Sequence, residues 1–501
     1  MTSIIVGSIY IICCLALFAY GMQCYILTFL YLRKRKEKLE YHHKVMKYFE
    51  DITNPQEYPL VVTQLPMYNE KTVARRIIEA VCSIDYPISR HEIQVLDDST
   101  DDTKDLIDQI VSEYQKKGYK ISVIRRKNRI GFKAGALQNG LKYTNAEFVA
   151  IFDSDFVPPK DFLKKTLSFF MKRPKLGLVQ ARWGHLNSKS SLVTMGQAMG
   201  IDGHFMVEQA ARSWNNLFMN FNGTAGVFRR AAIESCGGWH HDTLTEDMDL
   251  SYRMQLNDWE SEYVPEIEVP AELPEDINAF KNQQFRWAKG SIQTALKIIP
   301  LLKKKKVSPF KFFQAILHLT HYSVHPLMLS LAFLTVPVLF LINIYLHPVL
   351  LAVLITIMIL STSGPITMYM VSQHYLGNKI RKKIFMIPVM MLIGTGLAVN
   401  NAKAVIEALM KKDSEFLRTP KKGQYQRLIY KPFKDITWLI ELLCGLYCLV
   451  GLWFFIGFSN VIISPFLVLY SSGFLFIGIL SIIHYNKPDL ISVRLKDFLK
   501  N

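Results

Sequence analysis

Phe148-Val149-Ala150-Ile151-Phe152-Asp153-Ser154-Asp155 joins an apolar run to an acidic turn. Apolar runs of this length indicate buried strands, and further strands are predicted over Pro59–Leu65, Glu92–Leu96, Lys120–Ile124 and Gly177–Ala181. Helical patterns lie between them, for example over Lys71–Ser83 and Thr103–Gln115. Because the strands alternate with helices, the sequence predicts a mostly parallel sheet in a Rossmann-like α/β domain.

Two long tracts beyond this domain contain no Asp, Glu, Lys or Arg, one between Lys311 and Lys379 and one between Glu441 and Lys487. Each can hold two membrane helices, because one helix needs about 20 apolar residues. A third apolar run, Ile4–Leu32, predicts an uncleaved anchor, since it is too long for the apolar core of a signal peptide. We therefore expect a multi-pass membrane protein with about five spans.

The net charge of +17 does not require a nucleic acid, because basic clusters stand beside the apolar runs. These clusters are Arg33–Lys36, Lys303–Lys306 and Arg381–Lys383. The positive-inside rule and anionic headgroups explain them, and they place the soluble domain in the cytoplasm. The seven cysteines show no metal-binding spacing, so neither a disulfide nor a zinc site is expected.

Charge and hydropathy divide the chain into an N-terminal transmembrane helix (1–32), a polar, helical connector in the cytoplasm (33–54), a cytoplasmic domain (55–306), a membrane region (307–485) and a cytoplasmic tail (486–501). Within the membrane region, 384–410 is expected to be interfacial or re-entrant. If it crossed the membrane, the basic residues that follow it would lie outside, against the positive-inside rule.

Acidic residues follow two of the predicted strands, at the edge where α/β sheets bind ligands. The carboxylates in Leu96-Asp97-Asp98-Ser99 can accept hydrogen bonds from a nucleotide, although capping of the next helix explains part of this run. Asp153 and Asp155 can bind a divalent cation that holds a diphosphate. The alternative for these two acids is a solvated turn.

Other polar motifs in the domain also have two readings. Lys133 stands where a helix begins, and can neutralise phosphate or lie on the surface. In Thr245-Glu246-Asp247, Asp247 can act as a general base or simply stabilise a helix N-terminus. The loop 220–226 is small enough to approach an acceptor, but a glycine turn explains it equally well. The run 283–287, Gln-Gln-Phe-Arg-Trp, offers an aromatic face and a forked donor for a sugar phosphate, or belongs to an ordinary amphipathic helix.

The order of these motifs resembles that of the membrane-embedded, processive glycosyltransferases of family 2, which include cellulose, hyaluronan and cellulose-synthase-like mannan synthases. Further matches are Leu65–Glu70, Lys133–Gly135, Gln180–Trp183, Phe221–Thr224 and, beyond the domain, Glu415–Lys421, which resembles a gating loop. The resemblance implies a GT-A catalytic domain inserted between transmembrane helices.

The resemblance also implies roles for individual residues. Asp247 would be the catalytic base of an inverting transfer, and Asp153 and Asp155 would bind Mg²⁺ or Mn²⁺. The nucleotide sugar would be bound by Tyr68, Glu70, Asp97, Lys133, Asp153, Gln283 and Arg286. The acceptor would be bound by Asn222, Gly223, Thr224, Glu246 and Trp287. A gating loop at 411–424 would close over the nucleotide through Phe416, Arg418, Thr419 and Lys421.

The expected activity is processive β-hexosyl transfer from UDP-glucose, the default donor, or from GDP-mannose, with export of a β-glucan or mannan across the cell membrane. A second copy of the chain or an accessory export protein are further expected partners. Two positions depart from cellulose synthases: Asn222 replaces a usual Cys, and Arg418-Thr419-Pro420 replaces a common Val-Thr pairing. The chain ends soon after its last apolar run, so a fused cyclic-dinucleotide sensor is not expected.

Two other functions remain open. A non-processive enzyme, similar to ceramide glucosyltransferases, would add one sugar to a lipid. A channel or transporter with a nucleotide-sensing domain would need ionisable groups or broken helices in its spans. The charge-free tracts offer only histidines such as His318, His321 and His325 near one end.

Overall fold

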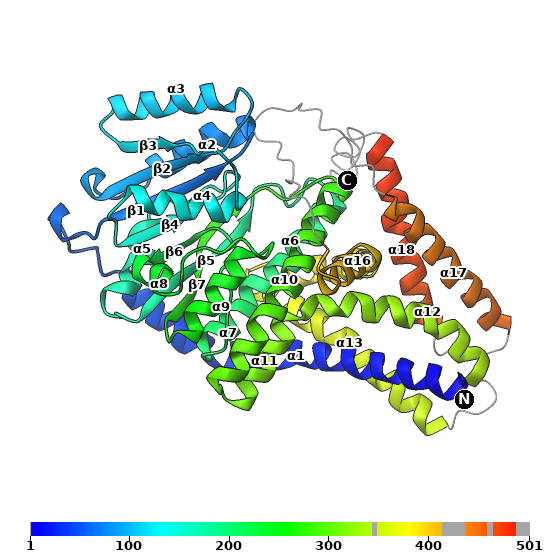
Figure 1. The fold of residues 1–501 in the computed structure, drawn as a ribbon. Coiled ribbons are helices and arrows are strands. Elements are labelled where there is room, and N and C mark those ends of the chain that lie inside the picture. Colours follow the sequence, from blue (N-terminus) through cyan, green and yellow to red (C-terminus); the bar gives the residue numbers. More distant parts are fainter. Residues whose placement is uncertain (1, 343–347, 413–435, 458–463, 487–501) are drawn as a thin grey trace.

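The computed structural model describes residues 2–342, 348–412, 436–457 and 464–486. Among these residues, seven strands form one sheet in the order β3-β2-β1-β4-β6-β5-β7. The strands are β1 (Val61–Met67), β2 (His91–Asp97), β3 (Lys120–Ile124), β4 (Phe148–Ile151), β5 (Leu176–His185), β6 (Gly226–Arg229) and β7 (Glu260–Ala271). The sheet domain lies at one end of the molecule, and the long helices extend from the other (Figure 1).

The sheet is mixed rather than wholly parallel. The β1–β2, β1–β4, β2–β3 and β5–β7 pairs are parallel, whereas β6 runs antiparallel to β4 and β5. The reversal of β6 matters for the site. It brings the loop that precedes β6 to the edge where β4 ends, and the backbone N–H of Ala225 donates to the carbonyl of Ile151 at 2.9 Å. The predicted α/β architecture is confirmed, and β6 is the antiparallel exception.

Helices cover both faces of the sheet. Apolar side chains of α2, α3 and α5 pack with one buried cluster and those of α4, α7 and α8 with another, so each face carries its own core. The helices of the domain are α2 (Lys71–Cys82), α3 (Thr103–Lys116), α4 (Phe132–Gly140), α5 (Phe162–Met171), α6 (Leu192–Gly203), the π-helical turn η4 (His204–Gln209), α7 (Ala210–Trp214), α8 (Arg230–Ser235), α9 (Glu246–Leu256), α10 (Ile277–Lys305) and α11 (Pro309–Leu319).

The remaining helices form the membrane region. They are α1 (Thr2–Val45), α12 (Val324–Ile342), α13 (Pro348–Tyr375), α14 (Ile380–Lys383), α15 (Ile387–Gly396), α16 (Ala398–Leu409), α17 (Thr437–Gly457) and α18 (Ser464–Asn486). In the described part of the chain, α1, α13, α17 and α18 are long and apolar enough to span a membrane. Two bent helix pairs raise the number to as many as 6. The chain is a multi-pass membrane protein.

Two expectations for this region can be compared with the structure. The segment predicted to be interfacial bends by 40° between α15 and α16, as a broken span or re-entrant element does. Helix α1 continues without a break from the apolar run to Val45, so the first part of the connector, which was predicted to be helical, extends the same helix. Its extension through the expected connector is rich in Lys, Arg and Glu, which are strong helix formers.

Helix α10 joins the sheet domain to the membrane region through two buried ion pairs. Nζ of Lys281 lies 2.7 Å from Oε1 of Glu441 on α17, and Nζ of Lys289 lies 3.1 Å from Oε2 of Glu407 on α16. The two lysines stand on either side of the 283–287 motif. The turn of α10 that carries this motif is therefore anchored to membrane helices at both ends.

Candidate active site

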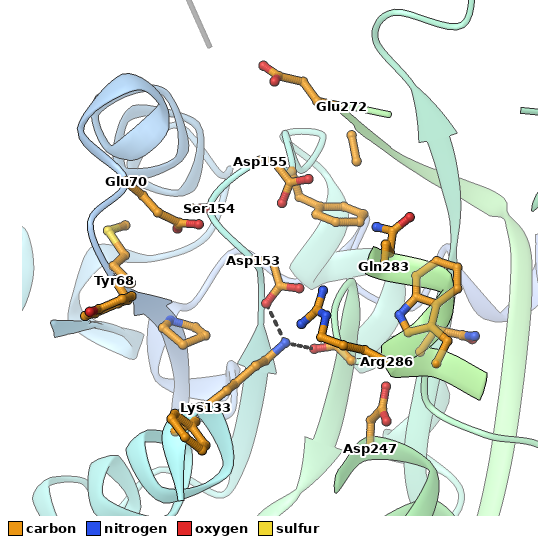
Figure 2. Close-up of a pocket in the computed structure, with 18 of the residues that line it drawn as sticks. Tyr68, Glu70, Lys133, Asp153, Ser154, Asp155, Asp247, Glu272, Gln283 and Arg286 are labelled. Atoms are coloured by element: carbon orange, nitrogen blue, oxygen red, sulfur yellow. Dashed lines mark hydrogen bonds and ion pairs between the residues drawn. The ribbon is translucent and has the colours of Figure 1, made fainter. Parts of the chain in front are cut away.

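A cavity opens at the carboxyl ends of β1 and β4, and α9 and α10 form its opposite wall (Figure 2). It brings together residues that are far apart in the sequence. Of the predicted site residues, those that line it are Tyr68, Glu70, Lys133, Asp153, Asp155, Asn222, Gly223, Glu246, Asp247, Gln283, Arg286 and Trp287. Thr224 lies directly behind this wall, where its hydroxyl accepts a hydrogen bond from the backbone N–H of Asp153 at 2.8 Å.

Lys133 bridges two parts of the cavity wall (Figure 2). Its ammonium donates to Oδ1 of Asp153 at 2.5 Å and to the carbonyl of Gly223 at 2.7 Å. Burial alone would lower the pKa of Lys133, but the carboxylates of Asp153, Glu246 and Asp247 raise it. The lysine is therefore a fixed cation, in a position to neutralise a phosphate that enters the cavity.

The carboxylates of Asp153 and Asp155 point into the same part of the cavity (Figure 2). Asp155 is only 4% exposed, and its backbone carbonyl accepts a hydrogen bond from Arg76 at 3.3 Å. Two carboxylates on one turn, next to open space, fit a hard divalent cation, which prefers oxygen ligands.

A second acidic group fits a cation less well. One ligand atom each from His240, Asp242 and Asp249 lies within 4.8 Å of the others. The ammonium of Lys297 already contacts Asp242 at 2.8 Å and Asp249 at 3.0 Å. Because this positive charge balances both carboxylates and the group does not line the cavity, we assign it to packing between α9 and α10.

Asp247 lies in the first turn of helix α9 and faces the cavity (Figure 2). Its Oδ1 accepts a hydrogen bond from the backbone N–H of Met248 at 2.8 Å, which fixes the side chain at the helix N-terminus. Burial, and then the neighbouring carboxylate of Glu246, raise the pKa of Asp247 to about 7. A carboxylate with this pKa can take up a proton near neutral pH, as a general base must.

The loop before β6 packs directly against this carboxylate. Gly223 has a left-handed backbone with φ of +84°, and a Cβ atom built there would lie 3.0 Å from Oδ2 of Asp247. Asn222 is held by Gln180, whose Oε1 accepts the Asn222 backbone N–H at 3.0 Å. Asn222 and Gly223 thus stand beside the candidate base, where an acceptor hydroxyl would have to approach.

Helix α10 supplies Gln283, Arg286 and Trp287 to the cavity. Burial lowers the pKa of Arg286, although the carboxylates of Glu246, Asp153 and Asp247 oppose this effect. The Trp287 ring lies 6.4 Å from that of Trp183, centroid to centroid. The helix therefore adds a half-buried cation and an aromatic wall to the site.

The two acids after β2 are arranged differently from the prediction. Asp97 is absent from the cavity wall that the described residues form. Its carboxylate instead accepts a hydrogen bond from Nε of Arg125 at 2.8 Å. Asp98 lines the cavity and pairs with Arg126. The guanidinium of Arg129 covers the ring of Tyr68, 3.3 Å from its centroid.

The wall also contains residues that were not predicted as site residues, among them Asp98, Arg129, Trp183 and Glu272. Asp98 and Trp183 belong to the motifs Leu96–Ser99 and Gln180–Trp183, whose order along the chain could have pointed to them. Glu272 directly follows β7, whose charged sequence hid the strand. The expected gating residues Phe416, Arg418, Thr419 and Lys421 lie outside the described residues.

Comparison with known proteins identifies the domain. Residues 55–290 match the protein family described as "Glycosyltransferase like family 2". A "Glucomannan 4-beta-mannosyltransferase 1" of Cyamopsis tetragonoloba is 42% identical over 297 residues, covering 57% of this chain and 56% of that protein. A "Probable glucomannan 4-beta-mannosyltransferase 7" of Oryza sativa subsp. japonica is 46% identical over 262 residues, covering 51% of this chain and 45% of that protein.

The chain thus spans about half the length of the curated relatives that it matches. Among solved structures, a Pyrobaculum calidifontis mannosyltransferase in complex with GDP-Man and Mn²⁺ aligns with a TM-score of 0.49 and 18% identity, over 79% of this chain and 100% of that one. The sequence match confirms the resemblance drawn from the motifs: over residues 55–290, this chain carries a domain of glycosyltransferase family 2.

Proposed function

We propose that this protein is an inverting mannosyltransferase that transfers mannose from GDP-mannose to the end of a growing β-mannan or glucomannan chain. The observation that carries the proposal is the position of Asp247. It lies against the acceptor loop at Gly223 and shares one cavity with Lys133, Asp153 and Arg286. The names of the relatives support mannose as the sugar. They do not support UDP-glucose as the default donor.

The proposed reaction is a single displacement. Asp247 takes the proton from an acceptor hydroxyl as the hydroxyl oxygen forms a bond to the anomeric carbon of the donor. The bond from that carbon to the diphosphate breaks, and the nucleoside diphosphate leaves with the electron pair. Attack opposite the leaving group inverts the configuration, so an α-linked donor gives a β-linked product.

The remaining residues of the cavity bind and orient the reactants. Lys133 and Arg286 would balance the charge of the diphosphate, as fixed cations in a site of low dielectric. Asp153 and Asp155 would hold Mg²⁺ or Mn²⁺, which would supply further positive charge at the diphosphate. Trp287 and Trp183 offer aromatic faces on which a pyranose ring can pack.

We further propose that the product remains in contact with the membrane region and is exported through it. This proposal rests on the two ion pairs that anchor α10, beside Trp287, to membrane helices α16 and α17. It requires the sheet domain to face the cytoplasm, as the basic residues beside the apolar helices indicate.

A donor screen tests the function. Purified protein in detergent with Mg²⁺ or Mn²⁺ is incubated with radiolabelled GDP-mannose or UDP-glucose, and the product is separated into lipid-soluble and high-molecular-weight fractions. We expect label from GDP-mannose in β-linked polymer. Label only in a lipid extract would instead support the single-sugar enzyme, and incorporation from UDP-glucose alone would refute the choice of donor.

A further inference from the structure

The π-helical turn η4 faces the acceptor loop with two side chains that an α-helix would separate. His204 and Gln209 are five residues apart, which in an α-helix places them about 140° apart around the axis. In η4 both reach the side chain of Asn222. Nε2 of His204 lies 3.0 Å from Nδ2 of Asn222, and Nε2 of Gln209 lies 2.5 Å from Oδ1. Such π-helical turns often occur at functional sites.

A backbone carbonyl fixes the orientation of both amides. Nε2 of Gln209 is 2.7 Å from the carbonyl oxygen of Asn220, and a carbonyl can only accept, so this Gln209 atom must be the amide nitrogen. The Asn222 atom that faces the same nitrogen must then be the oxygen. The amide nitrogen of Asn222 therefore points toward His204.

The same reasoning fixes the proton on His204. Its Nε2 faces the N–H donors of Asn222 and must accept, so the ring proton is on Nδ1 and is donated to Oε2 of Glu208 at 2.9 Å. Oε1 of Glu208 accepts from Nε of Arg212 at 3.0 Å, and Arg212 is fully buried. Hydrogen-bond donation therefore runs from Gln209 through Asn222 and His204 to Glu208, and the carboxylate of Glu208 also accepts from Arg212 on its other side.

Charge supports this arrangement. Burial alone would raise the pKa of Glu208, but Arg212 and then His204 hold it well below its usual range. Glu208 is therefore a stable anion that keeps the proton of His204 on the side away from Asn222. Neither His204 nor Glu208 lines the cavity, so the pair acts on the site through Asn222.

We propose that His204 is a positioning residue that holds the amide of Asn222 in the orientation that Gln209 sets, so that an N–H group, and not a carbonyl, faces the acceptor side of the cavity. Asn222 has two N–H groups, and His204 takes one. The other can donate to a hydroxyl oxygen of the acceptor sugar, next to the hydroxyl that Asp247 deprotonates. This inference rests on the proposed function and specifies its acceptor: a sugar that accepts a hydrogen bond at this point. A Cys in place of Asn222 would be a weaker donor.

Two substitutions of His204 distinguish a role in positioning Asn222 from a role in stabilising the fold alone. The amide of Gln in His204→Gln can replace Nε2 and still accept from Asn222. The shorter amide of His204→Asn can replace only Nδ1. This variant therefore keeps the hydrogen bond to Glu208 but loses the hydrogen bond from Asn222. The two variants are similar in polarity, and His43→Asn, at an exposed position on α1, serves as a control.

The first measurement is steady-state kinetics with a soluble manno-oligosaccharide acceptor. For His204→Asn we expect the acceptor KM to rise about three- to tenfold, because one hydrogen bond is lost. The KM for GDP-mannose should stay unchanged. His204→Gln should stay near wild type. Equal acceptor KM values for wild type and His204→Asn, or an equal rise in both His204 variants, would overturn the inference.

The second measurement is calorimetric binding of the same oligosaccharide to wild type and both variants, without donor. If only His204→Asn binds the oligosaccharide more weakly than wild type, the inference is supported. This holds even if the wild type transfers no sugar, and then only the proposed function fails. Equal binding by all three proteins overturns the inference, even if the wild type is an active mannosyltransferase.

Discussion

Gly223 leaves no free space for a side chain beside Asp247, since a Cβ atom built on Gly223 would lie 3.0 Å from Oδ2 of Asp247 and 3.5 Å from Nζ of Lys133. The acceptor loop therefore passes close to the proposed base, and its Gly223 carbonyl accepts a hydrogen bond from Lys133 at 2.7 Å. The left-handed φ of +84° at Gly223 makes this approach possible.

Gly223→Ala should lower mannose transfer on the order of 100-fold, because the added methyl group would displace Asp247 from the acceptor hydroxyl. Gly118→Ala is the matched control, since Gly118 has φ of +88° but nothing within 4 Å of its added Cβ. Both variants strain the backbone, and only one touches the site. Equal losses of activity would mean that strain alone, and not contact with Asp247, causes the effect.

The pH dependence of kcat/KM should report Asp247. The base must be ionised, so activity should rise as pH increases through about 7, the pKa to which burial and Glu246 raise this carboxylate. In Glu246→Gln, Asp247 stays buried, but the neighbouring negative charge that helps to raise its pKa is removed. The midpoint of the acidic limb should then move to lower pH, and a midpoint that stays or moves up would contradict the assignment.

Asp155→Asn should abolish the dependence of GDP-mannose binding on Mg²⁺ or Mn²⁺. Chelation of the metal should weaken nucleotide binding by wild type and have little further effect on this variant, as measured by equilibrium binding. Asp85→Asn is the control, because the Asp85 side chain is 70% exposed and pairs with Lys164 on the surface. If Asp155→Asn binds GDP-mannose with normal metal dependence, the metal lies elsewhere.

Glu441→Gln should destabilise the protein by about 3–5 kcal/mol, because it leaves the ammonium of Lys281 buried without its counter-ion. The double variant Lys281→Met/Glu441→Leu should recover most of this loss. Asp258→Asn, which breaks an exposed pair with Lys305, should cost at most about 1 kcal/mol. Thermal unfolding in detergent measures all three, and a double variant no more stable than Glu441→Gln would contradict the ion-pair account.

The sequence predicted the fold where strands are apolar and failed where they are charged. Strands β1 to β5 were found within a few residues, apart from the longer C-terminal end of β5. In β7, Glu260, Glu262 and Glu268 interrupt the apolar pattern, and each pairs with an arginine of a neighbouring segment. Such long-range pairs leave no local signal, and the four residues of β6 are too few to show a period.

The sequence predicts the motifs that make up the candidate site but not how they are arranged in space. The resemblance selected Asp97, whereas Asp98 lines the cavity. Adjacent side chains at a strand end point to opposite sides, so the choice depends on how the end of β2 is oriented. The contact of Gly223 with Asp247, and that of His204 with Asn222, depend on how β6, α9 and η4 meet in space. Sequence order alone does not contain this information.

The central claim, that Asp247 is the base of a mannosyl transfer, is tested most directly by Asp247→Asn with radiolabelled GDP-mannose and a manno-oligosaccharide acceptor. We predict that transfer falls by about 10²–10⁴-fold, while the affinity for GDP-mannose, measured in parallel, stays near that of wild type. Transfer at the wild-type rate, or loss of nucleotide binding in place of turnover, would contradict the account.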